Sequence, residues 1–321
     1  MKKDLLTIKD LSAKDIAEIF ALTQKIKANK NKFTSALKGK SVGLIFQKPS
    51  NRTRVSFEVG VWELGGHCIY LGPDEINLGQ RETAADVART LSRYLSAIVA
   101  RTFSHETVEE LASYAAIPVI NGLSDFSHPC QALADVFTIK EKKKSFKVIT
   151  LAYIGDGNNV CHSLLMAAAK VGLNIRIATP EAYAPDAGVV AEARSAGQGS
   201  GAKIALGNEP TEAAKNADVI YTDVWASMGQ EAEAEKRKKD FAGFQVNSPL
   251  TALAKKDYLF MHCLPAHRGQ EVGDEIMDSQ HSIVFDQAEN RLHVQKAILI
   301  WILGKRDKIP NHKFQITNKS Q

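Results

Sequence analysis

The chain has few cysteines, and their spacing excludes two kinds of small scaffold. Only four occur in 321 residues, at Cys68, Cys130, Cys161 and Cys263, and no pair has the C-x-x-C spacing of a zinc or redox site. Four scattered cysteines also do not make the disulfide framework typical of small secreted domains. The sequence therefore predicts no metal site and a reducing compartment, the cytoplasm.

Long apolar runs are missing, and so is a strong excess of one charge. No stretch approaches the ~20 apolar residues that span a bilayer, and the N-terminus continues into alternating charge instead of an apolar signal core. The net charge of +5 favours anionic small molecules but is too small for a nucleic-acid footprint. Lysines gather at 140–144 and 236–239, where acidic residues interrupt or precede them. We expect neither a membrane nor a nucleic-acid partner.

What the chain does have is a regular alternation of short apolar runs with amphipathic ones. The strand candidates are 42–46, 68–71, 97–100, 118–120, 148–154, 175–178, 204–206, 219–222 and 259–262. Helical patterns lie between them, including long ones near 128–144 and 290–303. This alternation predicts an α/β fold of two domains, each a doubly wound parallel sheet flanked by helices, linked by long helices.

The length predicts the same division, because 321 residues exceed one typical domain. We place the first domain at 1–140 and the second at 141–290, with a C-terminal helix at about 291–321 that packs back on the first. Ligands of such sheets bind outside the C-terminal ends of the strands. We therefore expect a catalytic cleft between the two domains.

The stretch Ser50-Asn51-Arg52-Thr53-Arg54 has the composition of an anion cradle. It lies between a strand candidate and a helical pattern at 55–64, so it should form a helix N-terminus. Free backbone N–H groups and the helix dipole would there add to the arginines in holding a phosphate. The plain alternative is a solvated basic turn.

Other polar groups follow strand candidates too, although each has a plain alternative. Arg101 follows 97–100 and could be a surface arginine, and His128 begins a helix and could be a simple cap. Asp223, with Ser227 and Met228 after it, follows 219–222, and Cys263 follows 259–262; taken singly, such a methionine or cysteine is more often buried core. Together they mark the binding edge of two sheets.

A glycine-rich turn, Gly155-Asp156-Gly157-Asn158-Asn159, follows the first strand of the second domain and invites comparison with a dinucleotide fingerprint. The match is weak because the third glycine is missing and the next strand ends in Thr179-Pro180 without an acidic residue for a ribose. An NAD-dependent oxidoreductase is a distant alternative.

The chain resembles the ornithine carbamoyltransferases of the aspartate/ornithine carbamoyltransferase family over essentially its whole length. The motifs that carry the resemblance are Ser50-Asn51-Arg52-Thr53-Arg54, Arg101-Thr102, His128-Pro129-Cys130-Gln131, Asp223 with Ser227-Met228-Gly229, His262-Cys263-Leu264-Pro265 and Asn290-Arg291. The resemblance implies transfer of a carbamoyl group from carbamoyl phosphate to the δ-amine of L-ornithine, giving citrulline and phosphate. It also implies a homotrimer with active sites at subunit interfaces, without a metal or organic cofactor.

The resemblance assigns roles residue by residue. Catalytic roles fall on Arg101, His128, Cys263 and Arg291. Carbamoyl-phosphate binding falls on Ser50, Asn51, Arg52, Thr53, Asn77, Arg101, His128, Gln131, Cys263, Leu264 and Arg291. Ornithine binding falls on Asn159, Asp223, Ser227 and Met228.

Two positions depart from the family pattern. Asn51 stands where the family usually has threonine, so a hydroxyl to the phosphate is lost while the backbone N–H remains, and we expect modest weakening at most. Asn77 occupies a position where relatives often present glutamine or histidine to the neighbouring subunit, and the shorter amide would reach the phosphate through water.

The mechanism implied is direct attack through a tetrahedral transition state. Arg101, His128 and Thr53 would donate toward the carbonyl oxygen as it becomes more negative. The amine must lose its proton first, since an alkylamine has a pKa of about 10.4. Cys263 would contact the δ-amine and assist this loss, so the rate should rise toward mildly alkaline pH.

Other acceptors and classes stay open. Putrescine or N-acetylornithine could replace ornithine, and Arg268, near the second-domain loop, could favour the extra carboxylate of aspartate. A catalytically inactive anion-binding regulator is the non-enzymatic alternative. Synthesis and breakdown of arginine use the same chemistry, so the sequence fits either.

Overall fold

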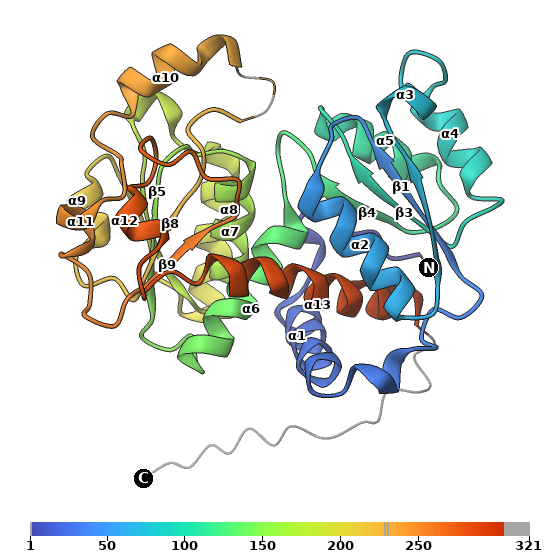
Figure 1. The fold of residues 1–321 in the computed structure, drawn as a ribbon, viewed down its shortest axis with the longest axis horizontal. Coiled ribbons are helices and arrows are strands. Elements are labelled where there is room, and N and C mark those ends of the chain that lie inside the picture. Colours follow the sequence, from blue (N-terminus) through green and yellow to red (C-terminus); the bar gives the residue numbers. More distant parts are fainter. Residues whose placement is uncertain (1, 228, 230, 305–321) are drawn as a thin grey trace.

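Two parallel sheets form the framework of the protein (Figure 1). The computed structural model describes residues 2–227, 229 and 231–304. The first sheet has the order β2-β1-β3-β4, formed by β1 (Ser41–Phe46), β2 (His67–Leu71), β3 (Ala97–Arg101) and β4 (Val119–Leu123). The second has the order β7-β6-β5-β8-β9, formed by β5 (Thr150–Ile154), β6 (Asn174–Ala178), β7 (Ile204–Gly207), β8 (Val219–Thr222) and β9 (Leu259–His262). The predicted fold class is confirmed.

Helices cover both sheets. In the first unit they are α1 (Ala13–Ala28), α2 (Asn51–Glu63), α3 (Pro73–Ile76), α4 (Ala84–Leu91) and α5 (His105–Tyr114). In the second they are α7 (Asn159–Val171), α8 (Ala187–Ser200), α9 (Pro210–Ala214), α10 (Ala234–Asp240), α11 (Ser248–Thr251) and α12 (Asp274–Met277). Single 3-10 turns lie at η1 (Ile8–Asp10), η2 (Lys30–Phe33), η3 (Glu181–Tyr183) and η4 (Glu231–Glu233). None of the described helices is long and apolar enough to cross a membrane.

The central strands are apolar because both of their faces are covered. Every residue of β3 is buried, and in β1 only the first residue is partly exposed. Parallel strands covered on both faces read as continuous apolar runs, which is why the sequence locates them well.

Two long helices, α6 (Pro129–Lys143) and α13 (Val284–Leu303), join the units (Figure 1). They pack against each other, and α13 also packs against α1 and α2 of the first unit. The structure begins α13 six residues before the predicted start at Asn290, because the buried Gln287 interrupts the apolar pattern there. Residues 305–321 of the predicted C-terminal helix lie outside the described residues.

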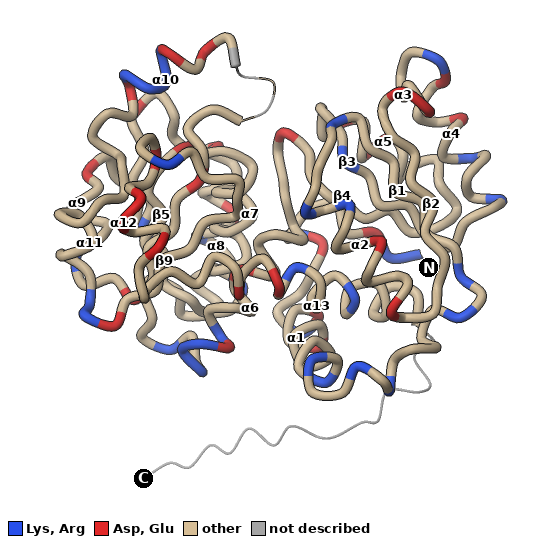
Figure 2. Tube along the Cα trace, viewed as in Figure 1, with Lys and Arg blue, Asp and Glu red and all other residues tan. Residues whose placement is uncertain are grey.

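Acidic and basic residues are interspersed along the outer segments of both units (Figure 2). The two lysine-rich runs follow this pattern, since Lys142 pairs with Asp286, Lys143 with Asp257, and Lys236 with Asp240. Such mixed charge is typical of a solvated surface.

Candidate active site

A cavity of about 400 Å³ lies between the two units, where the C-terminal ends of strands from both sheets converge. Its lining comes from the segments after β1, β3 and β4 on one side and after β5, β8 and β9 on the other. It includes these predicted site residues: Ser50, Arg52, Thr53, Arg101, His128, Gln131, Asn159, Asp223, Ser227, Cys263, Leu264 and Arg291. Twelve of the predicted site residues therefore line one continuous cavity.

The N-terminus of α2 forms one wall of the cavity. Ser50 is its N-cap, and the Ser50 Oγ accepts a hydrogen bond of 3.3 Å from the Thr53 N–H. The first turn thus places backbone N–H groups and the positive end of the helix dipole at the wall of the cavity, an arrangement suited to an anion. Arg52 reaches across the cavity and donates to the carbonyl oxygen of Leu264. This contact joins the first unit to the loop after β9.

The guanidinium groups of Arg52, Arg101 and Arg291 line the same cavity. Arg101 ends β3 and is buried, and its Nε has no hydrogen-bond partner among the described residues. Burial, and then the charges of Arg291 and Arg52, lower the pKa of Arg101 to about 10, so it stays cationic near neutral pH. None of the three forms an ion pair with a carboxylate among the described residues. Concentrated positive charge without an internal counter-ion is suited to an anionic ligand.

Arg291 is fixed at the base of this cluster by three acceptors. Its Nη1 donates to the Gln131 Oε1, its Nη2 to the Thr53 Oγ1 at 3.3 Å, and its Nε to the Gln295 Oε1 at 2.9 Å. Because α13 packs against the first unit, this guanidinium lies on the same side of the cavity as Thr53.

His128 is the N-cap residue of α6 and is buried. Its backbone N–H donates to the Ser163 Oγ at 2.8 Å, which fixes the turn. Its ring Nδ1 has no hydrogen-bond partner within the part of the chain that the structure describes. Burial and the neighbouring arginines hold the pKa of His128 well below its ordinary value. The imidazole is therefore neutral near pH 7 and can donate a single ring N–H to a substrate oxygen.

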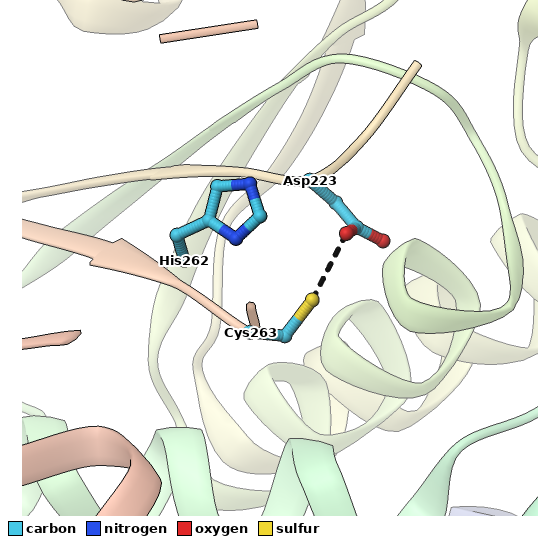
Figure 3. Close-up of side chains that lie close together, drawn as sticks. All are labelled: Asp223, His262 and Cys263. Atoms are coloured by element: carbon cyan, nitrogen blue, oxygen red, sulfur yellow. Dashed lines mark hydrogen bonds between the residues drawn. The ribbon is translucent and has the colours of Figure 1, made fainter. Parts of the chain in front are cut away.

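The opposite side of the cavity is acidic and centres on Asp223. Its Oδ1 accepts from the Cys263 Sγ at 2.9 Å (Figure 3). Its Oδ2 accepts from the Asn158 Nδ2 at 3.0 Å. Burial, and then the charge of Asp223, raise the pKa of Cys263 well above its ordinary value. Cys263 is thus a neutral thiol that donates a hydrogen bond, and the Asp223 carboxylate accepts it.

His262 lies beside this pair but has its own partners. The reactive atoms of Asp223, His262 and Cys263 all lie within 4.8 Å of one another (Figure 3), a spacing that a metal ion could bridge. However, the His262 Nε2 is bonded to Glu271 at 3.1 Å, and its Nδ1 accepts from the Leu264 N–H at 2.8 Å. Both ring nitrogens therefore shape the loop after β9.

Comparison with known proteins gives one consistent family. Residues 3–141 match the carbamoyl-P binding domain of aspartate/ornithine carbamoyltransferase, and residues 147–302 match its Asp/Orn binding domain. The chain is 55% identical to an ornithine carbamoyltransferase of Pyrococcus horikoshii over 308 residues, covering 94% of this chain and 96% of the relative. The chain belongs to the aspartate/ornithine carbamoyltransferase family.

Solved carbamoyltransferase structures superpose closely. The ornithine carbamoyltransferase from Pyrococcus furiosus has a TM-score of 0.91 at 54% identity, covering 94% of this chain and 97% of that chain. The anabolic ornithine carbamoyltransferase from Campylobacter jejuni has a TM-score of 0.89 at 39% identity, covering 94% and 98%.

Two described residues assigned by the carbamoyltransferase pattern do not line the cavity, and a third assigned residue is not described. Asn51 is exposed on the first turn of α2 and is not among the residues that line the cavity. Asn77 caps α3 in a left-handed conformation with φ of 42°, in a loop whose predicted role lies at a neighbouring subunit. Met228 lies outside the described residues, although Ser227 lines the cavity.

The cavity also includes residues that the sequence reasoning missed. Lys48 is buried and lies over the Phe103 ring, with its Nζ 4.6 Å from the ring centroid; its position two residues before the cradle could have marked it. Asn158 caps α7 and holds Asp223. Ser124 was missed because β4 extends to Leu123, three residues beyond the predicted strand.

The glycine-rich turn after β5 packs against its own chain. A Cβ on Gly157 would lie 2.3 Å from the Pro185 nitrogen and 2.6 Å from the Ala184 carbonyl carbon. We therefore expect Gly157→Ala to lower the free energy of unfolding by about 1–3 kcal/mol through overpacking, measured by urea denaturation. Gly199→Ala, at an open helical position, is the matched control. Equal stability of both variants would contradict this packing role.

Proposed function

We propose that the chain transfers the carbamoyl group of carbamoyl phosphate to the δ-amine of L-ornithine, producing L-citrulline and phosphate. One observation carries the proposal: a single cavity has three guanidinium groups on one side and Asp223 on the other. An anionic donor and a cationic acceptor would fit these two sides in one orientation. The named relatives point to the same reaction.

The donor half holds the phosphate and polarises the carbonyl. Ser50, Arg52 and Thr53 would bind phosphate oxygens together with the N–H groups of the first turn of α2. Arg101 and the neutral His128 would donate to the carbonyl oxygen, where negative charge develops during attack. Gln131 and Leu264 complete this half, and Arg291 would balance the departing phosphate.

The acceptor half orients the amino acid. Asp223 would bind an ammonium group of ornithine, with Asn159 and Ser227 beside it, and the family pattern adds Met228. The attacking amine needs a proton acceptor, because an alkylamine with a pKa of about 10.4 is mostly protonated at pH 7. The amine's proton would pass to Asp223 or to water, with the Cys263 thiol fixing the position of the carboxylate. The rate should therefore rise toward mildly alkaline pH.

Replacing Cys263 by serine tests this role of the thiol. Serine can still donate to Asp223, but its shorter C–O bond displaces the carboxylate, so we expect kcat/KM to fall about tenfold, within the range for a modest misplacement. The alkaline rise should persist, because it comes from the amine. An activity profile equal to that of the wild type in both height and shape would contradict any role for Cys263.

The acceptor is tested by measuring citrulline or the corresponding product with ornithine, putrescine, N-acetylornithine and aspartate in parallel. We expect a clear preference for ornithine. Aspartate is disfavoured because the site presents Asp223 to the acceptor, while Arg268 is held at the surface by Asp274 and Asp278. Preference for another acceptor would refute the proposal, and binding without product formation would identify an inactive regulator. Detectable NAD binding would instead support the oxidoreductase alternative.

We further propose that the protein is a homotrimer in the cytoplasm, with 1–140 binding carbamoyl phosphate and 141–290 binding ornithine. One face of α2 supports self-association, since Val55, Val59 and Trp62 recur at helical spacing and are 49%, 38% and 77% exposed. Such a stripe on a soluble helix commonly marks an interface. The four free cysteines suit a reducing compartment.

Trp62→Glu tests the interface. We expect the variant to elute with a mass below that of the wild type in size-exclusion chromatography with light scattering, and to lose activity if Asn77 serves a neighbouring subunit. Phe285→Glu is the control, because Phe285 is equally prominent at 74% exposure but lies on another element. A Trp62→Glu protein with unchanged mass would rule out this face.

A further inference from the structure

Asp135 is a buried carboxylate outside the cavity lining, yet it is bonded to Gln131, which lines the cavity, and to residues of α13 and β8. It lies on α6 and is fully buried. Its Oδ1 accepts from the Gln131 Nε2 at 2.8 Å and from the Gln287 Nε2 at 2.7 Å, and its Oδ2 accepts from the Tyr221 hydroxyl at 2.9 Å. These donors come from α6, α13 and β8.

The orientation of both glutamine side-chain amides is fixed, because the Oε1 of each one lies against a group that can only donate a hydrogen bond. The Gln131 Oε1 accepts from Arg291, and the Gln287 Oε1 accepts from the backbone N–H of His262 at 3.0 Å. Each amide must then turn its Nε2 toward Asp135. Two donors converging on one point require an acceptor there, and a carboxylate provides one without offering a competing donor.

We propose that Asp135 is a positioning residue for the transfer reaction, which holds Arg291 through Gln131 and the segment 262–264 through Gln287. The inference rests on the proposed function, because it assigns Arg291 to the donor half and Cys263 and Leu264 to the substrate contacts. A single side chain would then set the geometry of both substrate sites.

Stability alone is a poor reason for this residue. Burying a carboxylate is costly, and hydrophobic side chains of similar volume often stabilise a fold at least as well. In the neighbouring contact between the same helices, the Asn290 Nδ2 of α13 donates to the uncharged Thr138 hydroxyl at 2.9 Å and to the partly exposed Glu141 at 3.0 Å, so no fully buried carboxylate is needed there. The charge at Asp135 is therefore better explained by the two donors that it orients.

Three variants separate positioning from stability. Asp135→Asn keeps the shape but replaces one acceptor oxygen by a donor and removes the charge; we expect kcat/KM to fall about 100-fold with each substrate, the size of a displaced site. Gln287→Met cuts the branch to His262, so we expect kcat/KM for ornithine to fall, while the Kd of inorganic phosphate, which Arg291 and the first turn of α2 would hold, changes less than about twofold. Thr138→Val removes a buried hydrogen bond between α6 and α13. It should lower the Tm without changing kcat/KM for either substrate.

Tyr221→Phe supplies a readout that a merely structural role would not move. Burial raises the pKa of Asp135 to about 6, whereas the Tyr221 hydrogen bond lowers it. Removing that bond raises the pKa of Asp135 further. Activity should therefore begin to fall at a higher pH on acidification than in the wild type, and it should recover at alkaline pH. Arg291, Tyr221 and Cys263 are the charged or titratable groups that face Asp135 from α13, β8 and the loop after β9; burial keeps Tyr221 and Cys263 neutral here by raising each pKa well above its usual value.

The outcomes are distinct. A lower Tm in Asp135→Asn with unchanged kinetics, or an unshifted acid limb in Tyr221→Phe, would overturn the positioning role. If Asp135→Asn does not fold, Gln287→Met and Tyr221→Phe decide the question. A wild-type protein that forms no citrulline would refute the proposed function instead. The branch to Arg291 would then be tested by calorimetric titration with inorganic phosphate of the wild type, of Gln287→Met and, where it folds, of Asp135→Asn. We expect weaker phosphate binding only in Asp135→Asn.

Discussion

Replacing Arg101 by methionine is expected to lower kcat/KM by about 100- to 1000-fold, the usual effect of removing a donor to a developing oxyanion. Methionine fills much of the same buried space but cannot donate to the carbonyl oxygen. Steady-state citrulline formation measures the loss, and the Tm shows whether the protein remains folded. Arg89→Met, at an exposed position on α4, should leave the kinetics unchanged.

Arg101→Lys sharpens this result. Burial and two neighbouring guanidinium groups lower the pKa of the arginine, and they would lower the pKa of a lysine at the same position from a smaller starting value. We expect partial activity that declines as the pH rises, because the lysine loses its charge. Full activity in either variant would show that Arg101 does not stabilise the transition state.

Replacing Asp223 by asparagine is expected to lower kcat/KM for ornithine by about 1000-fold, as for removal of one partner of a buried charged pair. Asparagine keeps the shape but neither neutralises an ammonium nor accepts its proton. The Kd of carbamoyl phosphate should change little, because Asp223 faces the acceptor side. Asp218→Asn, a buried aspartate just before the other end of β8, is the control and should affect stability rather than the KM for ornithine.

The same substitution has a chemical readout at Cys263. The charge of Asp223 and its hydrogen bond with the thiol both raise the pKa of Cys263. Their removal lowers that pKa, so a larger thiolate fraction should react with iodoacetamide near pH 8. Alkylation no faster in Asp223→Asn than in the wild type, followed by mass spectrometry, would contradict the pairing of the two side chains.

The two sheets were predictable because buried parallel strands consist of continuous runs of apolar residues. β1 and β3, which are almost wholly buried, were located to within one residue of their ends. The site followed from them, since polar residues after strands of a parallel sheet meet at one edge. Arg101 and Asp223 lie at such edges of two different sheets, and both line the cavity because these two edges converge.

The parts that were not predictable are polar and buried. Asp135 and Gln287 are 152 positions apart in the sequence, and neither follows a strand. Buried polar side chains on helices have no periodic signal, so only the packing of α6 against α13 brings them together. The burial of Lys48 was not predictable for a different reason, because a lysine before a basic motif is typical of a solvated turn.

The path of α13 determines when the protein can fold during synthesis. This helix forms from nearly the last described residues, yet it packs against α1 and α2 of the first unit, where Lys296 is buried and bonded to Glu63. The first unit therefore exposes an apolar surface on the ribosome until the second unit has been translated. Domains generally fold in order from the N-terminus, but here the first domain completes its core last.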